Sequence, residues 1–316
     1  MKSKVVLSLF VATGLLVSMA AANAIVDFPS IPNISMKTVV ANFDNASGSG
    51  VDTFPGIAGE GWAGSWQVCD YYGNLNTTVT VEDATHELHA GNGSYLSVLA
   101  ENPNAITGEI GTHSLSRCYD ATSGIDLSKD HSIEFTLRID ETEFDDVFFT
   151  DMWSYEDRYE ITGSDMARGE FGAADTFAIM AAGNEGAWGS EQIVRKWAFA
   201  DGNKRGFINT FVGSGIDLVQ GGVYDFAITL DVDAKTYDIT VTDSIDTFTA
   251  EGLGWITDAE TAGGWLNFIT QSSNSYPYPE NRAMSIDNIR ISQVPEPSMV
   301  VLFLGLVFGL LVWRKK

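Results

Sequence analysis

The chain has few positive charges: its 316 residues include 18 lysines and arginines but 42 aspartates and glutamates, a formal net charge of −24. Proteins bind nucleic acid by neutralising its phosphates with cations, and an acidic surface repels it. We therefore expect no nucleic-acid partner. Disorder is excluded as well, because 45% of the residues are hydrophobic and the acids are scattered along the chain.

Long amphipathic helices and several catalytic motifs are missing too. No Gly-x-Ser-x-Gly occurs, so a serine-hydrolase elbow is unsupported. His86 and His89 are one residue too close for the zinc-protease pattern, which also requires a helix. The glycines of 59–64 match a dinucleotide-binding fingerprint by letter, but Trp62 and Trp66 accompany them and no helix follows. We interpret this segment as a tight loop with packed indoles.

The N-terminal region has the features of a secretory signal peptide. Two lysines precede an apolar stretch at 5–17, and Ala22 and Ala24 form a small-x-small cleavage site. We predict a signal peptide over 1–24, read by the Sec translocon, and a linker over 25–37.

The C-terminal region, 294–316, combines three elements in a fixed order. A Pro-Glu-Pro motif precedes an apolar run at 299–313, and a cluster of cations ends the chain. The run would span about 22 Å as a helix, short of a bilayer core of about 30 Å. This order resembles the PEP-CTERM sorting signal of Gram-negative bacteria, while an ordinary transmembrane tail is the alternative. The residues of the predicted signal are Pro295, Glu296, Pro297, Arg314, Lys315 and Lys316.

The resemblance implies processing by the membrane enzyme exosortase, after an intermediate stage in the inner membrane. The body would then reach the cell surface or the extracellular matrix. Outside the cytoplasm the environment is oxidising, so we predict a disulfide between Cys69 and Cys118, the two cysteines of the chain.

Between the two ends, the dominant period is two. Apolar and polar residues alternate over 132–140 and over 237–242, as in half-buried strands. A polar turn inside 223–242 predicts an antiparallel hairpin. The chain therefore predicts an all-β fold, an antiparallel β-sandwich or jelly roll over 38–293. Further strands are expected at 38–43, 77–81, 94–99, 176–181, 194–199, 266–270 and 283–292.

Four segments, 54–66, 132–140, 234–238 and 285–291, are similar to parts of concanavalin A-like (laminin G-like) jelly rolls. This resemblance implies a curved sheet whose concave face often holds sugars. Laminarinase-like members carry a Glu-x-Asp-x-x-Glu strand, and the nearest match here begins at Glu143, with Phe148 in place of the last glutamate. A glycosidase needs two flanking carboxylates, so no catalytic pair is identified.

Calcium is the cofactor that the acidic loops favour, because carboxylate and carbonyl oxygens are its ligands. By resemblance to jelly rolls that clip their first and last strands together, Asp44 and Asp287 are the predicted ligands. The alternative is that Asp287 caps a turn.

Aromatic residues in loop-like contexts are the candidates for a sugar-binding face, because sugar rings stack their C–H faces on aromatic rings. Packing beneath a loop is the alternative for each of them. The candidates are Trp153, Tyr155, Trp188, Tyr276 and Tyr278.

These features together predict an exported surface or matrix protein that binds exopolysaccharide or another cell-surface glycan without catalysis. One alternative is a polysaccharide-degrading enzyme, a glycosidase or lyase, on the same scaffold. Another is a purely structural matrix protein without a ligand site.

Overall fold

The computed structural model of the chain describes residues within one compact unit, Met36–Lys316. The predicted signal peptide, nearly all of the predicted linker and the sorting tail after 294 lie outside the described residues. The described ranges are 37–41, 43, 62–72, 76–82, 86–101, 111–141, 158–167, 175–183, 191–202, 211–272 and 281–294.

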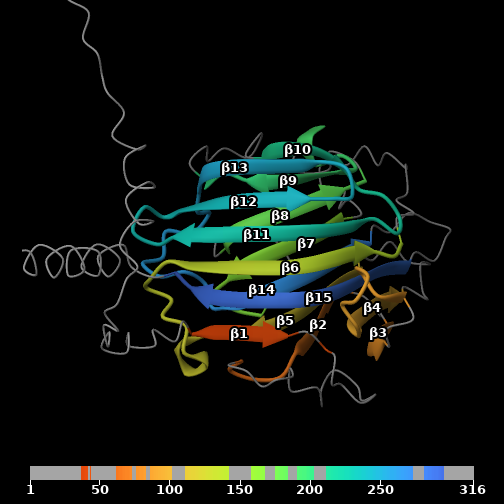
Figure 1. Cartoon of the computed structure of the whole chain (residues 1–316), viewed down its shortest axis with the longest axis horizontal. Helices are drawn as coiled ribbons and strands as arrows, with labels where there is room; N and C mark the ends of the chain where they lie inside the picture. The colour runs from red at the N-terminus through yellow and green to blue at the C-terminus, as the bar shows by residue number, and fades with distance from the viewer. Residues whose placement is uncertain are drawn as a thin grey trace, which may run out of the picture. The chain divides into compact units, whose positions relative to one another are not determined.

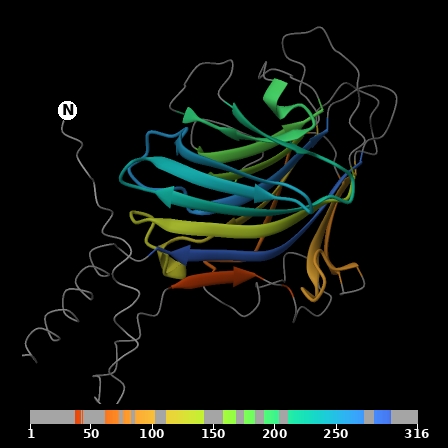
Figure 2. The ribbon, with the colours of Figure 1, turned by 45° about the horizontal axis from the view of Figure 1, so that its top comes forward.

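Two antiparallel sheets pack face to face (Figures 1 and 2). Sheet A runs in the order β13-β12-β11-β6-β15-β4-β3, and β1 also pairs with β15. It is the sheet nearest the viewer in Figure 1. Its strands are β1 (Thr38–Ala41), β3 (Asn76–Glu82), β4 (Tyr95–Glu101), β6 (His131–Ile139), β11 (Val223–Asp231), β12 (Thr236–Thr242), β13 (Thr247–Gly254) and β15 (Asn281–Gln293).

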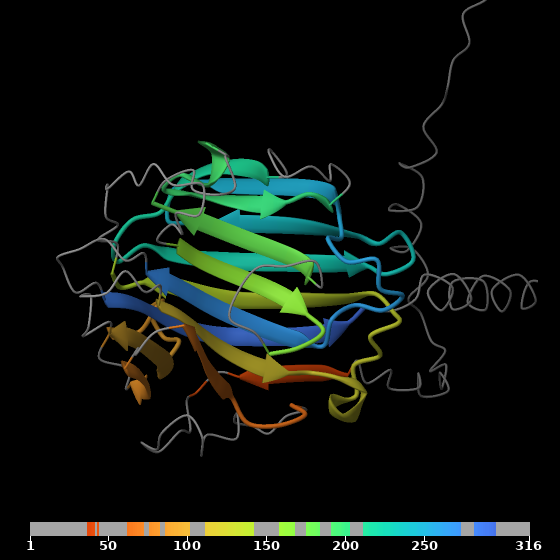
Figure 3. The same cartoon turned by 180° about the vertical axis from the view of Figure 1, so that it is seen from behind.

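Sheet B, seen from its own side in Figure 3, runs in the order β10-β9-β8-β7-β14-β5-β2. Two short 3-10 turns, η4 (Ala121–Ser123) and η6 (Glu191–Ile193), accompany the strands. The predicted all-β antiparallel sandwich is therefore confirmed. The strands of sheet B are β2 (Gln67–Tyr72), β5 (Gly111–Cys118), β7 (Arg158–Ser164), β8 (Asp175–Ala182), β9 (Lys196–Ala200), β10 (Phe211–Asp217) and β14 (Trp265–Ser272).

Aromatic rings fill the space between the sheets. Phe135 of sheet A stacks on Phe226 of the neighbouring strand, with ring centroids 5.0 Å apart, and meets Phe268 of sheet B edge-on at 5.2 Å. Trp197 of sheet B contacts Phe226 edge-on at 5.3 Å. Such pairs contribute about 0.5–1.5 kcal/mol beyond burial, so these rings join the two layers.

The predicted hairpin is confirmed as β11 and β12, paired from Asp225↔Thr242 to Asp231↔Thr236. The turn between them places Lys235 at φ 53°, the left-handed conformation that such turns require. The Asp231 carboxylate accepts a hydrogen bond from the Ala234 backbone amide at 2.8 Å, which stabilises the turn.

Strand β15 changes partners along its length. Its first half pairs with β4, up to Ile286↔Leu96, and its second half pairs with β1, from Ile289↔Ala41 onward. Between the halves, the register with β6 shifts at a bulge, where Asn288 takes φ 52°. Asparagine tolerates this left-handed conformation better than most residues, so the local sequence accounts for the break.

The outer faces of the two sheets differ. On sheet B, most outward side chains of β5, β7 and β14 are polar yet buried. Over β8 and β9 the same face carries a second apolar cluster that includes Met180 and Ala198. On sheet A, the outer face is polar and largely exposed along β11 and β12. The buried polar residues of sheet B include Ser114, Ser116, Thr162, Ser164 and Asn267.

Candidate functional site

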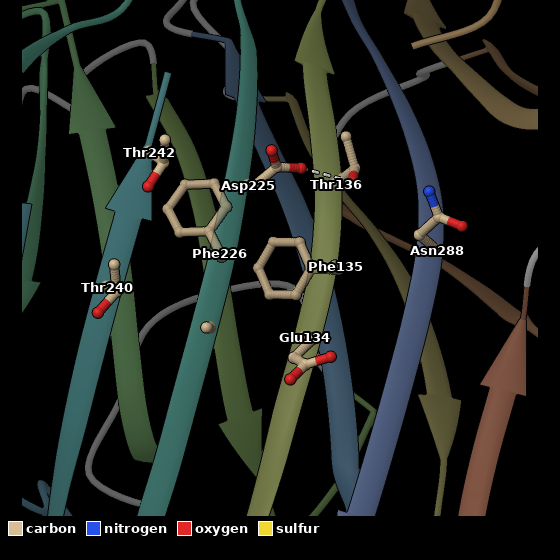
Figure 4. A pocket seen from close by; sticks show the side chains of 9 residues that line it. Glu134, Phe135, Thr136, Asp225, Phe226, Thr240, Thr242 and Asn288 are labelled. Carbon is tan, nitrogen blue, oxygen red and sulfur yellow. Dashed lines mark hydrogen bonds between the residues drawn. The ribbon is translucent and has the colours of Figure 1, made fainter. Parts of the chain in front are cut away.

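A hollow of about 280 Å³ lies on the outer face of sheet A, over four adjacent strands (Figure 4). Carboxylate, hydroxyl and amide groups surround it, and two core phenylalanines, Phe135 and Phe226, form its floor. The outward-facing residues that line it are Glu134 and Thr136 of β6, Asp225 and Ala227 of β11, Thr240 and Thr242 of β12, and Asn288 of β15.

Strand alternation and register bring these side chains together. In β6, Phe135 points into the core, so Glu134 and Thr136 on either side of it point outward. Antiparallel pairing then sets Asp225 opposite Thr136 and Ala227 opposite Glu134. The hollow therefore follows from the positions of polar residues in strands that are separated in the sequence.

A short side chain creates the depression. Across the sheet, Ala227 lies between Glu134 on one neighbouring strand and Thr240 on the other. Both flanking side chains are longer than its methyl group. The surface therefore dips at Ala227, with oxygen atoms on both sides.

Asp225 is the most constrained polar group of the hollow. Its Oδ1 accepts a hydrogen bond of 2.7 Å from the Thr136 hydroxyl, drawn as a dashed line in Figure 4. The His89 Nε2 lies 3.0 Å from each of its two oxygens. These contacts fix the orientation of the carboxylate, although its side chain is still 48% exposed.

A hydrogen-bonded cluster adjoins the hollow along β6. The Arg138 guanidinium donates to Asp140 at 2.5 Å, to Ser285 at 3.1 Å and to the His86 carbonyl at 2.6 Å. It also lies 4.9 Å from the ring centre of Tyr95. Segment 86–94 is therefore held at this end of the face by both Arg138 and the His89 contact.

Threonine hydroxyls continue the polar surface to the edge of the sheet. Thr240 and Thr249 approach at 2.9 Å, and Thr242 and Thr247 approach at 3.1 Å, each pair on opposing strands. Hydroxyls both donate and accept hydrogen bonds. The hollow and its surroundings can thus bind a ligand rich in hydroxyl groups. A single carboxylate such as Glu134 binds a cation only weakly.

The predicted calcium ligands are only partly described. Asp44 lies outside the described residues, while Asp287 is fully buried at the β15 bulge. One of its oxygens, Oδ1, accepts a 2.7 Å hydrogen bond from the Asn288 backbone amide, as in a capped turn. Within the described ranges, no three His, Cys, Asp or Glu side chains gather closely enough to hold a metal ion. The Asp44–Asp287 site stays a prediction.

The predicted aromatic ligand contacts and the terminal signals cannot be placed. Trp153, Tyr155, Trp188, Tyr276 and Tyr278 all lie outside the described residues. The same holds for Ala22, Ala24 and the Pro295–Pro297 and Arg314–Lys316 motifs. In the part of the chain that is described, no helix is long and apolar enough to cross a membrane.

The predicted disulfide between Cys69 and Cys118 is not formed in this structure. The two residues are on neighbouring strands, but Cys69 pairs with Ser114, four positions before Cys118. At about 3.3 Å per residue the offset is roughly 13 Å. A disulfide needs Cα atoms within about 7 Å, so the strand register keeps the thiols apart.

The residues of the hollow were not predicted as a site. The alternation of 132–140 identifies Glu134 and Thr136 as outward-facing, and that of 223–242 does the same for Asp225 and Thr240. Only the register between β6, β11 and β12 shows that they share one depression. His89 is exposed and its side chain bonds to a single side chain, that of Asp225.

Comparisons with known proteins add two findings. Residues 293–316 match the PEP-CTERM protein-sorting motif, which confirms the resemblance seen in the tail. No curated protein matches the chain.

Among solved structures, the fold is similar to lectin II from Ulex europaeus, with 10% identity, a TM-score of 0.37, and coverage of 72% of this chain and 99% of that one. The Lotus tetragonolobus seed lectin has 11% identity and a TM-score of 0.39, and the match covers 72% of this chain and 100% of that one. The catalytic domain of a GH131 beta-glucanase from Podospora anserina has 11% identity and a TM-score of 0.41, and the match covers 80% of this chain and 94% of that one. Likeness at this level carries no argument about ligand or activity.

Proposed function

We propose that the chain is an exported protein that binds polysaccharide without catalysis, through the hollow centred on Ala227. The observation that carries this proposal is a depression on an open sheet face, surrounded by the oriented Asp225 carboxylate, the Glu134 carboxylate and several hydroxyls. Sugars present many hydroxyl groups, which hydrogen-bond to carboxylate, amide and hydroxyl side chains.

Pre-orientation supports binding at this position. Thr136 and His89 hold Asp225 in one orientation before any ligand arrives. A group that is already ordered loses less conformational entropy on binding. The open, shallow shape suits a polymer lying across the sheet better than a small molecule enclosed in a pocket.

The sorting motif supports the location. A chain carrying a PEP-CTERM signal at 293–316 would pass the Sec translocon and the inner membrane, meet exosortase, and end at the cell surface or in the extracellular matrix. Polysaccharides are abundant ligands there. Exopolysaccharide in a biofilm matrix is the ligand that fits this destination.

A polysaccharide-degrading enzyme is the second candidate, because Glu134 and Asp225 line the same hollow. Their strand positions are diagonal neighbours, with Cα atoms about 7–8 Å apart, a separation compatible with a carboxylate pair. Against this, Asp225 is bound to both His89 and Thr136. These contacts already engage both carboxylate oxygens of Asp225.

The test is affinity electrophoresis of the full chain, purified in mild detergent, through gels containing the producing bacterium's exopolysaccharide. The Ala227→Tyr variant fills the hollow, and Thr229→Tyr is the matched control two residues along β11, where the side chain is also exposed. We expect polysaccharide to retard the wild type and Thr229→Tyr, and to retard Ala227→Tyr much less.

Equal retardation of both variants would show that the hollow is not the binding site. New reducing ends in the gel, abolished by Glu134→Gln, would favour the enzyme. Migration of the wild type unchanged by polysaccharide, with and without calcium, would favour a purely structural protein.

A further inference from the structure

Arg117 is a buried cation at the end of β5. It alternates with Leu115 and pairs with Leu266, both core residues, so its side chain faces the interior between the sheets. It is only 2% exposed. Its guanidinium carbon lies 4.5 Å from the ring centre of Trp62 and 5.4 Å from that of Trp66.

Few polar groups satisfy this guanidinium. Its Nε donates to the Gly64 carbonyl at 3.1 Å. Among the described residues, its buried Nη1 has no hydrogen-bond partner and its guanidinium forms no ion pair. Folded proteins seldom leave a buried charge without an opposite charge or a full set of hydrogen bonds. Arg117 is therefore an exception that requires an explanation.

A second unsatisfied donor lies beside it. In the described part of the chain, the buried indole Nε1 of Trp66 also has no partner, whereas that of Trp62 donates to the Val40 carbonyl at 3.0 Å. The Trp62 and Trp66 rings are 6.0 Å apart. Two neighbouring residues thus each present an N–H that lacks an acceptor, and one of the two carries a positive charge.

Burial also acts on the charge itself, because it lowers the pKa of the Arg117 guanidinium to about 10. The group remains protonated at neutral pH. An anion at this position would restore the solvation that the guanidinium loses on folding.

We propose that Arg117 and Trp66 form a binding site for a carboxylate group, with Trp62 as the ring on which the guanidinium stacks. The planar guanidinium fork matches a carboxylate, whose two oxygens accept several hydrogen bonds. The adjacent turn residues Ala63, Gly64 and Ser65 are exposed, so a carboxylate would reach the buried Nη1 by displacing this turn.

Two sources supply this chemistry: a uronic acid residue of a polysaccharide, or a small free carboxylate. The site lies within the core layer, whereas the Ala227 hollow lies on the outer face of sheet A. The proposal therefore does not rest on the function assigned to the hollow, and each site can be tested by its own variants.

The experiment measures the melting temperature of the full chain in mild detergent, with sodium glucuronate, polygalacturonate, or sodium chloride at the same ionic strength. Methyl glucuronate ester is the neutral control. A ligand that binds the folded state raises the melting temperature. We expect both carboxylates to raise it, and the ester and chloride to leave it unchanged. A larger effect of the polymer, at equal carboxylate concentration, identifies the uronate as the ligand.

Three variants locate the effect. Arg117→Met removes the donors and keeps an apolar stem against Trp62, and Arg117→Lys keeps the charge but loses the fork. Arg290→Met is the matched control, because Arg290 is an exposed arginine of β15. We expect glucuronate affinity to fall about ten- to hundred-fold in both Arg117 variants, the range for a lost charge-assisted hydrogen bond. We expect it to be unchanged in Arg290→Met.

Two outcomes would overturn the proposal. The first is a wild-type melting temperature that carboxylates do not raise, a result that needs no variant to fold. The second is a carboxylate effect that survives in Arg117→Lys, or that Arg290→Met reduces equally. Either outcome would leave Arg117 as a packing element of the Trp62 and Trp66 cluster.

Discussion

The imidazole Nε2 of His89 lies 3.0 Å from both carboxylate oxygens of Asp225, a residue 136 positions later in the chain. The contact attaches segment 86–94 to β11, a strand in the interior of sheet A. Both side chains are about half exposed, at 43% and 48%. The pair therefore orients Asp225 in the hollow more than it stabilises the fold.

We expect His89→Ala to lower the free energy of unfolding by less than about 1 kcal/mol, because water competes for a half-exposed polar contact. Urea denaturation measures this. His86→Ala is the control, since Arg138 binds the His86 backbone carbonyl rather than its side chain. A loss of several kcal/mol in His89→Ala alone would mean that segment 86–94 is a major structural element.

Asn288 provides a test of the bulge. We expect Asn288→Ala to cost about 1–2 kcal/mol, because an alanine at φ 52° meets the steric penalty of the left-handed conformation. Asn288→Gly removes the same side chain without that penalty and should stay close to the wild type. Comparison of the two by urea denaturation separates backbone strain from side-chain contacts. Equal costs for both variants would assign the effect to the lost amide.

His131 predicts a pH dependence of stability. It is fully buried, its Nδ1 lies 2.9 Å from the Lys129 carbonyl, and burial lowers the pKa of its imidazole below the ordinary 6.5. The unfolded chain takes up a proton near pH 6.5 while the folded chain does not. Stability is therefore complete above this pH and falls as the pH decreases from 6.5 toward the folded-state pKa, by at most about 1.4 kcal/mol per pH unit.

Urea denaturation from pH 7.5 to 4.5 measures this slope, and His131→Phe should flatten it. Two carboxylates affect the stability in a different, lower pH range. The hydrogen bonds from Thr122 to Asp120 and from Ser128 to Asp126 lower the pKa of each carboxyl group below 3.8. Their contribution is lost only at lower pH. A slope between pH 6.5 and 5 that persists in His131→Phe would contradict the assignment.

The separated cysteines predict a chemical result. Alkylation of the unfolded protein without reductant should label both Cys69 and Cys118, as judged by mass spectrometry. In the folded protein Cys118 should react slowly at neutral pH, because burial, and then the nearby Asp120 charge, raise the pKa of its thiol to about 11. A chain that is labelled only after reduction would show that the strand register of β2 is different.

The sequence predicted sheet A better than sheet B, for a physical reason. Strands β6, β11 and β12 have one buried and one exposed face, so apolar and polar residues alternate. In β5 and β7 of sheet B both faces are buried, and β5 places polar Ser114 and Ser116 where no solvent reaches them. In β5 only Leu115 among residues 112–117 is apolar, so the strand shows no alternation; β2, β5 and β7 were not predicted. Strands β10 and β13 were also not predicted, because glycines interrupt the alternation of apolar and polar residues in both.

The candidate site was harder to predict than the fold. Each strand of the hollow carries an ordinary polar residue facing outward, and nothing in the local sequence distinguishes Glu134 or Asp225 from other surface acids. The depression depends on Ala227 lying between longer neighbours from two other strands. Such a relationship is set by register, which a single sequence does not determine.

Strand β15 has one more consequence, for the order of events during export. This strand lies inside sheet A, and it directly precedes the sorting motif at 293–316. Its end pairs with β1, and Thr38 contacts Ser292 across 254 positions. The first strand can therefore find its place only after almost the whole chain has crossed the membrane. Folding is therefore completed late, when the tail has already reached the membrane. Contacts between residues so far apart in the sequence also slow folding.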